Sequence, residues 1–231
     1  MRVAGLAVAV AACVVAPVAA SATRQAPSRD WSRAVVLTPE GGFRMGNPGA
    51  RVKLVEYGSL ACPHCRHFKE TGYDPLVKNY VRTGRVSYEF RNLVLNGPDI
   101  SVSLLTRCAG AAGFFPMSAV VYATQPQWEK KVLGTSDADK AALEAMSDEQ
   151  RLLRYAANSG LVPVAARFGV TPAKARQCLT DGKALKRLLD MTQAATDKGV
   201  DHTPTFILDG NVTDAATWEQ LEPKLKTALS G

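Results

Sequence analysis

One segment constrains the fold of this chain more than any other: an apolar, β-rich run leads into two closely spaced cysteines at the predicted start of a helix. Residues 52–57 read Val-Lys-Leu-Val-Glu-Tyr, the composition of a strand buried on both faces. In the motif Cys62-Pro63-His64-Cys65, Pro63 takes the first helical position, where its missing N–H would have no partner. Cys62 therefore lies at the helix N-terminus and Cys65 one turn along, close enough to close a disulfide.

Further strands are predicted on both sides of this motif. Residues 34–37 form a short apolar strand candidate. After the cysteines, the predicted helix runs through Phe68, is interrupted around Gly72 and Pro75, and then resumes. Residues 86–90 alternate as a strand, and the order strand–helix–strand predicts that this strand is parallel to the one before the motif.

The second half of the chain is predicted to be mostly helical. From Ile100 to about Lys198 no strand pattern is convincing, and Ser147–Gln150 reads as a capping box that opens a helix. Strand signals return at residues 205–208, and Asp209-Gly210 predicts a hairpin turn after them. Residues 217–220 read as a second capping box before the last helix.

The layout is strand–strand–helix–strand, a helical insertion, and strand–strand–helix. Together with the cysteine motif it predicts an α/β chain with a thioredoxin fold and an inserted all-helical domain. The predicted division is a signal peptide at 1–22, a flexible leader at 23–32, the thioredoxin domain at 33–98 and 199–231, and the helical insertion at 99–198.

The first 22 residues have the features of a secretory signal peptide. Residues 1–2 carry the positive charge, residues 3–18 are almost wholly small and apolar, and residues 20–22 fit a cleavage site. A transmembrane anchor is the alternative, but the run is rich in Ala, contains Pro17 and falls short of a span. Cys13 ends a sequence similar to a lipid-attachment box, although the apolar run continues beyond it. We therefore expect a periplasmic protein with a cleaved signal, and favour lipid anchoring less.

Export would change the net charge of the mature chain and the redox environment of its cysteines. Removing Arg2 leaves 27 Lys and Arg against 21 Asp and Glu, so the formal net charge falls from +7 to +6. These charges form no basic block, so nucleic acid binding is not predicted. The four remaining cysteines, Cys62, Cys65, Cys108 and Cys178, would meet an oxidising compartment in which disulfides persist.

The Cys62–Cys65 spacing indicates thiol–disulfide exchange, which requires a thiolate as the nucleophile. Cys62 gains from the free N–H groups and the positive end of the helix, and His64 can add a positive charge or a hydrogen bond. A stabilised Cys62 thiolate favours the reduced form, which makes the disulfide a stronger oxidant. We therefore expect Cys62 to be the exposed attacking sulfur and Cys65 the buried resolving one, with no cofactor.

Three other interpretations of the motif are weaker. Zinc would need four ligands, and beyond Cys62, Cys65 and His67 no second pair is visible. Haem attachment needs a histidine directly after the second cysteine, where this chain has Arg66. A purely structural disulfide would close a small loop and gain little chain-entropy stabilisation.

The motif and its surroundings resemble the DsbA family of bacterial periplasmic thiol oxidases. Residues 54–59 and the Cys-Pro-His-Cys motif carry this resemblance, together with residues 199–206, Gly-Val-Asp-His-Thr-Pro-Thr-Phe, which are similar to the family's cis-proline loop. The glycines at 41, 42 and 46 match the subgroup with a short N-terminal lead-in. The likeness covers roughly residues 35–231.

The resemblance implies that Pro204 is cis and lies beside the cysteines, so that the Thr203 backbone can bind an extended substrate segment. It also implies that Glu56 lies beneath the active site and tunes proton transfer to Cys65, the alternative being a solvated, outward-facing side chain. Thr203 departs from the valine of the strongest oxidases and is more typical of isomerases. His202 stands where glycine is commoner, either against the active site or in solvent.

Cys108 and Cys178 both fall on apolar helical faces of the predicted insertion. They are either two buried thiols or, as we favour in an exported protein, a structural disulfide. Some relatives of the DsbA family imply a similar second bridge, which could also tune the active site.

The functional hypothesis is a monomeric enzyme that donates its disulfide to unfolded or reduced exported proteins. The resemblance implies reoxidation by a membrane partner linked to quinone. An isomerase or reductase that is kept reduced is the first alternative, which Thr203 favours mildly, although residues 23–50 are too short for a dimerisation domain. A binding or chaperone-like module without turnover is the second.

Overall fold

A computed structural model describes residues 1–3, 5, 29–133 and 136–231 of the 231-residue chain. Nearly all of the predicted signal peptide, including Cys13, and residues 23–28 of the predicted leader lie outside the described residues. The described part of the leader leads into a short 3-10 turn, η1 (Trp31–Arg33), which Asp30 caps by accepting a hydrogen bond from the N–H of Ser32.

A mixed sheet lies at the centre of the molecule, with its strands in the order β1-β2-β4-β3-β5-β6. β3 and β4 are parallel, as predicted, and every other neighbouring pair is antiparallel. The parallel pair brings the C-terminal ends of both strands to the edge where the cysteine motif begins. The strands are β1 (Val35–Leu37), β2 (Phe43–Met45), β3 (Val52–Gly58), β4 (Val86–Asn92), β5 (Thr205–Leu208) and β6 (Asn211–Val212).

No strand is predicted from the sequence at residues 43–45, and the structure corrects this, because these residues form β2. Only three residues long, Phe43–Met45 is too short to show an alternating pattern. It becomes a strand because it pairs with β1 on one side and with β4, more than forty residues away, on the other. Long-range pairing, which no local pattern reports, therefore decides this element.

The helix after the cysteines has the predicted interruption. α1 (Pro63–Thr71) ends at Gly72, α2 (Tyr73–Leu76) contains Pro75, and a π-helical turn, η2 (Val77–Val81), completes the connection to β4. Pro63 stands at the start of α1 directly after Cys62, as the sequence indicates.

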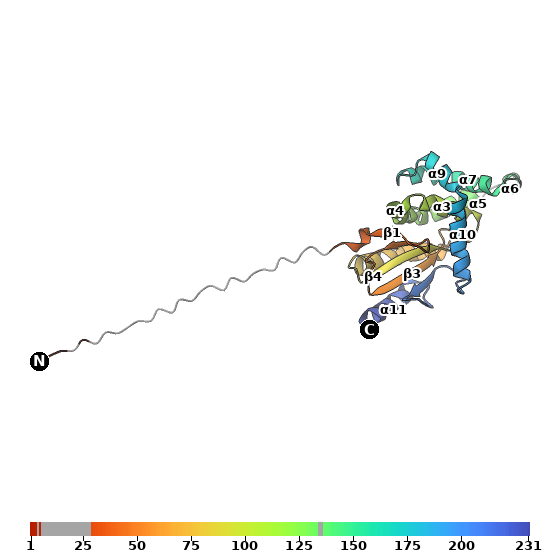
Figure 1. Ribbon diagram of the computed structural model, residues 1–231. Helices are drawn as coiled ribbons and strands as arrows, with labels where there is room; N and C mark the ends of the chain where they lie inside the picture. Colours follow the sequence, from red (N-terminus) through yellow and green to blue (C-terminus); the bar gives the residue numbers. More distant parts are fainter. Residues whose placement is uncertain (4, 6–28, 134–135) are drawn as a thin grey trace.

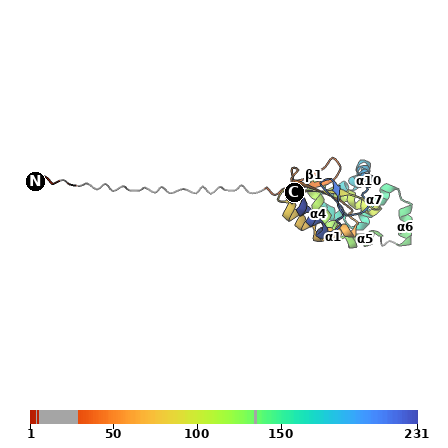
Figure 2. The same cartoon turned by 90° about the horizontal axis from the view of Figure 1, so that it is seen from below.

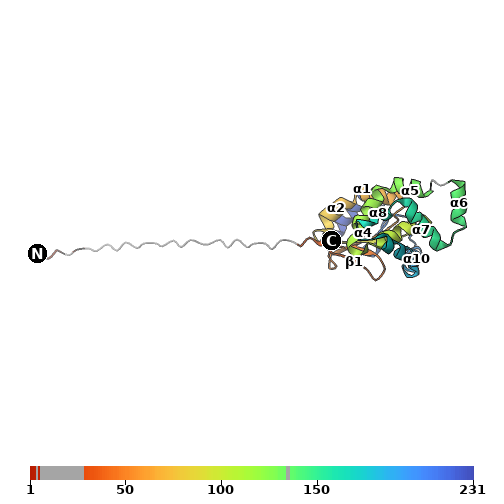
Figure 3. The same cartoon turned by 90° about the horizontal axis from the view of Figure 1, so that it is seen from above.

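Between β4 and β5 the described chain is helical, as predicted, and its helices gather above the sheet in Figure 1, while α10 descends beside it. The bounds are α3 (Gly97–Arg107), α4 (Gly110–Ala123), α5 (Gln125–Leu133), α6 (Asp137–Glu144), α7 (Asp148–Ser159), α8 (Val162–Ala166), α9 (Pro172–Leu179) and α10 (Gly182–Thr196). The capping box at Ser147 and Gln150 is confirmed. Figures 2 and 3 both show α6 at the outer end of this layer.

The C-terminal part differs from prediction in one detail. The hairpin turn is confirmed, with Asp209 and Gly210 at positive φ between β5 and β6. The second capping box is wrong, because the side chain of Thr217 makes no capping hydrogen bond to α11 (Trp218–Ser230). The carboxamide of Gln220 instead accepts a hydrogen bond from the N–H of Ala216.

One continuous core joins the sheet to the helices. Phe114 of α4 stacks on Phe43 of β2 with the ring centroids 4.1 Å apart, and Phe68 of α1 meets Phe206 of β5 edge-on. Among the described residues, no helix has both the length and the apolar character that a membrane span requires. The shared core places the helical layer firmly against the edge of the sheet that carries the motif.

Candidate active site

The two cysteines of the motif lie at the start of α1, directly after the loop that follows β3. Cys62 is the N-cap residue of α1, and Cys65 lies in its first turn. Both are free thiols and both are buried: Cys65 is fully enclosed and Cys62 is only 4% exposed. The prediction of an exposed Cys62 is therefore wrong, because the Thr203 loop packs against its sulfur. The Sγ atom of Cys62 lies 3.2 Å from the carbonyl oxygen of Thr203, which can accept a hydrogen bond from the thiol.

The surroundings separate the acidities of the two thiols. A hydrogen bond from Cys65 is the largest of the effects that lower the pKa of Cys62 to about 5. The Thr203 side chain and the backbone N–H groups of Cys65 and His64 also lower the pKa of Cys62, while burial opposes the shift. Burial first, and then the proximity of Cys62 and Glu56, raise the pKa of Cys65 well above its usual value. One sulfur is therefore set up as a thiolate and the other as a thiol.

The loop between α10 and β5 supplies the second wall of the site. The peptide bond between Thr203 and Pro204 is cis, the isomer that the resemblance implies. The next residue, Thr205, pairs with Tyr57 of β3 in the antiparallel ladder, which places this loop next to the start of the motif. His202 is exposed and contacts Asp201, with 2.9 Å between Nδ1 and Oδ1, so it lies in solvent rather than against the cysteines.

Glu56 lies inside the molecule, and the alternative of a solvated side chain is wrong. It is 2% exposed, on the strand that leads into the motif, and its carboxylate accepts a hydrogen bond from the hydroxyl of Tyr88 on β4. Burial raises the pKa of Glu56 to about 7, although the Tyr88 hydrogen bond and the charge of Lys69 oppose the shift. A carboxyl with this pKa can gain and lose a proton at neutral pH.

Lys69 belongs to the site, although the sequence analysis did not identify it. Its side chain and those of Glu56 and Cys65 line one cavity of about 10 Å³, which is on the order of the space that one water needs. Burial lowers the pKa of Lys69 to about 7. One sequence signal could have found it, since Lys69 follows Cys65 by four residues and such pairs share a helix face.

His64 is exposed in the first turn of α1. Its backbone N–H is one of the groups that lower the pKa of Cys62. Within the described residues, no group of three or more His, Cys, Asp or Glu side chains is placed to hold a metal ion.

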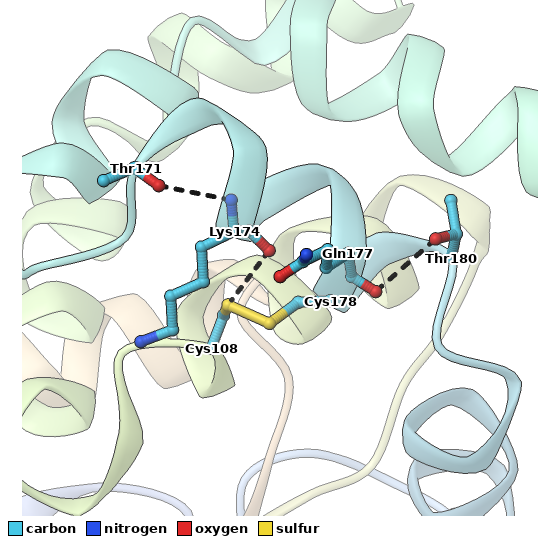
Figure 4. Close-up of a disulfide and its surroundings, with 6 residues drawn as sticks. All are labelled: Cys108, Thr171, Lys174, Gln177, Cys178 and Thr180. Atoms are coloured by element: carbon cyan, nitrogen blue, oxygen red, sulfur yellow. Dashed lines mark hydrogen bonds between the residues drawn. A yellow bond between two sulfur atoms is a disulfide. The ribbon is translucent and has the colours of Figure 1, made fainter.

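The other two cysteines of the described residues, Cys108 and Cys178, are bonded to each other (Figure 4). Cys108 follows the last turn of α3 and Cys178 lies on α9, with their Cα atoms 6.0 Å apart. The hydroxyl of Thr171 caps α9 by accepting a hydrogen bond from the N–H of Lys174, as Figure 4 shows. The bond therefore joins two helices of the insertion.

Comparison with known proteins places these features in a family. The family profile described as Thioredoxin matches residues 38–227, which is most of the chain. The chain therefore belongs to this thioredoxin family, and its solved neighbours are DsbA-like.

Two solved structures illustrate the likeness. The protein-disulfide isomerase from Novosphingobium aromaticivorans has 27% identity and a TM-score of 0.76, over 81% of this chain and 97% of that one. The alpha-DsbA1 protein of Wolbachia pipientis shares the fold, with a TM-score of 0.67 at 19% identity, over 84% of this chain and 94% of that one.

Two curated relatives carry the provisional name protein-disulfide oxidoreductase. The Rickettsia bellii protein is 26% identical over 50% of this chain and 45% of its own length. The Rickettsia prowazekii protein is 31% identical over 36% of this chain and 31% of its own length. The chain thus spans less than half of the length of these curated relatives.

Proposed function

We propose that this protein is a periplasmic thiol–disulfide oxidoreductase that donates the Cys62–Cys65 disulfide to unfolded or reduced exported proteins. The observation that carries the proposal is the placement of the two thiols: Cys62 is the N-cap residue of α1 beside the Thr203 carbonyl, and Cys65 is fully buried in the first turn of the same helix. These surroundings lower the pKa of Cys62 to about 5 and raise that of Cys65. A thiolate that is stable at neutral pH stabilises the reduced pair, so the oxidised pair is a strong oxidant.

Each turnover moves two electrons from substrate to enzyme. A substrate thiolate attacks Cys62 Sγ, which breaks the bond to Cys65 and forms a mixed disulfide. A second substrate thiolate then attacks the substrate sulfur of that mixed disulfide, and Cys62 leaves as a thiolate. The substrate has formed one disulfide and released two protons to the solvent, while the proton that Cys65 gains is transferred within the enzyme.

Glu56 supplies the proton that Cys65 needs when its sulfur is released. Neutral Glu56 can donate near pH 7, because burial raises its pKa to about that value. Glu56 and Cys65 line the same cavity of about 10 Å³, and one water of that size would relay the proton from carboxyl to sulfur. When the pair is reoxidised, the same carboxylate takes the proton back.

The substrate chain docks against the loop at Thr203 and Pro204. The Thr203 backbone lies beside Cys62, as its carbonyl distance of 3.2 Å indicates, and can pair with an extended segment in the manner of a β-strand. Exposed His64 contributes through its backbone N–H to the Cys62 thiolate and presents its ring to the incoming substrate.

The cellular setting completes the proposal. Residues 1–22 are a cleaved signal peptide, and lipid attachment at Cys13 is the less favoured alternative. The mature chain acts as a monomer, with the thioredoxin domain at 33–98 and 199–231 and the helical domain at 99–198. A quinone-linked membrane protein reoxidises the cysteines, and no cofactor takes part.

The reduction potential of the Cys62–Cys65 pair tests the proposal. Equilibration against glutathione should give a value less negative than about −200 mV, and the oxidised protein should form disulfides in a reduced, unfolded substrate. A potential near that of thioredoxin, about −270 mV, would contradict donation as the physiological direction.

A disulfide isomerase or reductase is the second candidate. Thr203 and the similarity to the Novosphingobium isomerase favour it. A refolding assay on a scrambled substrate separates the candidates, because an isomerase restores activity only when its cysteines are reduced. A binding module without turnover would keep its client binding in the Cys62→Ser variant, whereas either enzyme would lose all exchange activity.

A further inference from the structure

The loop between β3 and Cys62 is held by the helical insertion. Ser59 and Leu60 are fully buried in this loop. The hydroxyl of Tyr122 on α4 donates to the Ser59 carbonyl at 3.0 Å, and the carboxamide of Gln125 on α5 donates to the Leu60 carbonyl at 2.8 Å. The third contact is made by Asp99 on α3, and this one carries a charge.

Asp99 is a fully buried carboxylate that also binds the loop. Oδ2 accepts hydrogen bonds from the Ser59 hydroxyl at 2.6 Å and from the Leu95 N–H at 3.0 Å. Oδ1 accepts from the Leu60 N–H at 3.2 Å and from the Ser103 hydroxyl at 3.2 Å. Among the described residues no basic side chain forms an ion pair with Asp99, so these four donors alone satisfy it.

Helix capping does not account for this carboxylate. Asn96 already caps α3, since its side chain accepts a hydrogen bond from the Asp99 N–H. Burial raises the pKa of Asp99 to about 6, so the fold bears a cost to keep an acid here. An acid has two acceptor oxygens, and each of them bridges the loop to the segment around α3.

We propose that Asp99 is a positioning residue for the redox pair, which holds the Ser59–Ala61 loop so that the sulfur of Cys62 faces the first turn of α1 and Thr203. This inference rests on the proposed thiol chemistry of Cys62. It assigns to the insertion an effect, transmitted through Ser59, on the reactivity of a cysteine that belongs to the other part of the fold.

The connection from Asp99 to Cys62 is short and continuous. The Ser59 hydroxyl that donates to Asp99 also accepts a hydrogen bond from the Ala61 N–H at 3.0 Å. The Ser59 carbonyl accepts a hydrogen bond from the Cys62 N–H at 3.3 Å. A shift of Ser59 therefore moves the backbone of Cys62 relative to the N–H groups of α1, which stabilise the thiolate.

The substitution Asp99→Asn tests this role with almost no change in shape. If the Asn oxygen keeps the contacts to Leu60 and Ser103, its NH2 group faces the N–H of Leu95, which loses its acceptor. A second variant, Ser59→Ala, removes the hydroxyl that donates a hydrogen bond to Asp99 from the loop. The matched control is Ser101→Ala, which deletes a buried hydrogen bond that runs from α3 to the Leu152 carbonyl rather than to the loop.

The measurement is the titration of the Cys62 thiolate in the reduced proteins, followed by ultraviolet absorbance and by the pH dependence of alkylation. The midpoint should rise by about one unit in Asp99→Asn and in Ser59→Ala, and should stay at the wild-type value in Ser101→Ala. Thermal melting monitors folding in all three variants, and a merely structural role would lower stability without moving the midpoint.

Unchanged midpoints in folded Asp99→Asn and Ser59→Ala would overturn the positioning role. If Asp99→Asn does not fold, the Ser59→Ala midpoint alone decides. The titration does not depend on the direction of electron flow, so its result is separate from that of the potential measurement. A wild-type midpoint at the value of an ordinary cysteine would instead count against the proposed function.

Discussion

Burial shifts the pKa values of the two ionisable side chains next to Cys65 in opposite directions. It raises the pKa of Glu56 from 4.5 to about 7 and lowers that of Lys69 from 10.5 to about 7. The stability contributed by protonated Glu56 is complete below about pH 4.5 and is lost as the pH rises to 7. The contribution of neutral Lys69 is complete above about pH 10.5 and is lost as the pH falls to 7. The summed contribution of Glu56 and Lys69 to the free energy of unfolding therefore has a minimum near neutral pH.

Glu56→Gln should remove the loss of folding stability that the deprotonation of Glu56 causes as the pH rises from about 4.5 to 7. The free energy of unfolding of the reduced variant, relative to the reduced wild type, should rise by roughly 2–3 kcal/mol between about pH 4 and pH 7. The difference between the proteins isolates Glu56, because Cys62 titrates in both. Urea unfolding across this range is the measurement, and exposed Glu144→Gln is the control. A constant difference would show that Glu56 ionises normally in the folded protein.

Lys69→Met should raise the pKa of Glu56 further, because the positive charge of Lys69 is one of the effects that oppose the shift. We expect a rise of about one unit, followed by carbon NMR of the Glu56 carboxyl in the reduced protein. Exposed Lys78→Met removes a lysine of the η2 turn and serves as the comparison. An unmoved Glu56 titration in Lys69→Met would mean that the two charges do not interact.

At the scale of elements, short-range sequence signals placed most turns and caps correctly. The Asp209-Gly210 turn, the capping box at Ser147 and the interruption at Gly72 all stand as predicted. Each depends on residues within a few positions of one another, so the pattern alone suffices. β2 and the start of α11 differ, because their partners are chosen by packing and by a competing side chain, Gln220.

The hairpin turn offers a test in which side-chain space plays no part. Gly210 has a φ of 87°, and a methyl group there would meet no atom within 4 Å. Gly210→Ala should therefore destabilise the protein by about 1 kcal/mol through backbone strain alone. Gly182→Ala, in the first turn of α10, also has open space but no positive φ, and should be neutral or slightly stabilising. Equal effects in chemical denaturation would refute the strain argument.

At the scale of the whole molecule, the helical insertion and the sheet share one core. The insertion binds the loop before Cys62 through side chains of α3, α4 and α5. The Cys108–Cys178 bond ties α3 to α9 across 70 residues of sequence. The insertion is thus both a cover for the active-site edge and a support for its geometry.

Removal of the Cys108–Cys178 bond should destabilise the protein strongly. Closing a loop of this length lowers the entropy of the unfolded chain by an amount worth about 4 kcal/mol in the loop-entropy treatment. The comparison is between Cys62→Ser/Cys65→Ser and the same protein with Cys108→Ala and Cys178→Ala added. Under non-reducing conditions the two proteins then differ only in the Cys108–Cys178 disulfide. Equal unfolding midpoints would show that the bond contributes no stability.

Much of this protein follows from local sequence patterns. The redox motif, the parallel strand pair around it, the helical stretch and the hairpin all depend on residues that are close in sequence, so the α/β thioredoxin fold with an insertion could be predicted. The resemblance through residues 199–206 added the proline loop. Lys69 and Asp99 were missed, since neither has a meaning for the site until the chain is folded.

The sequence by itself determined which chemistry to expect, because a Cys-Pro-His-Cys motif at a predicted helix start favours thiol–disulfide exchange over zinc, haem or a purely structural bridge. The tertiary structure alone decided how acidic each group is. The burial of Cys65, Glu56 and Lys69, and the contact of Cys62 with Thr203, come from segments that are far apart in the chain, whereas the hydrogen bonds of Cys62 with Cys65 and His64 are local. A pKa depends on solvent exclusion and on neighbouring charges, and only the folded chain sets these.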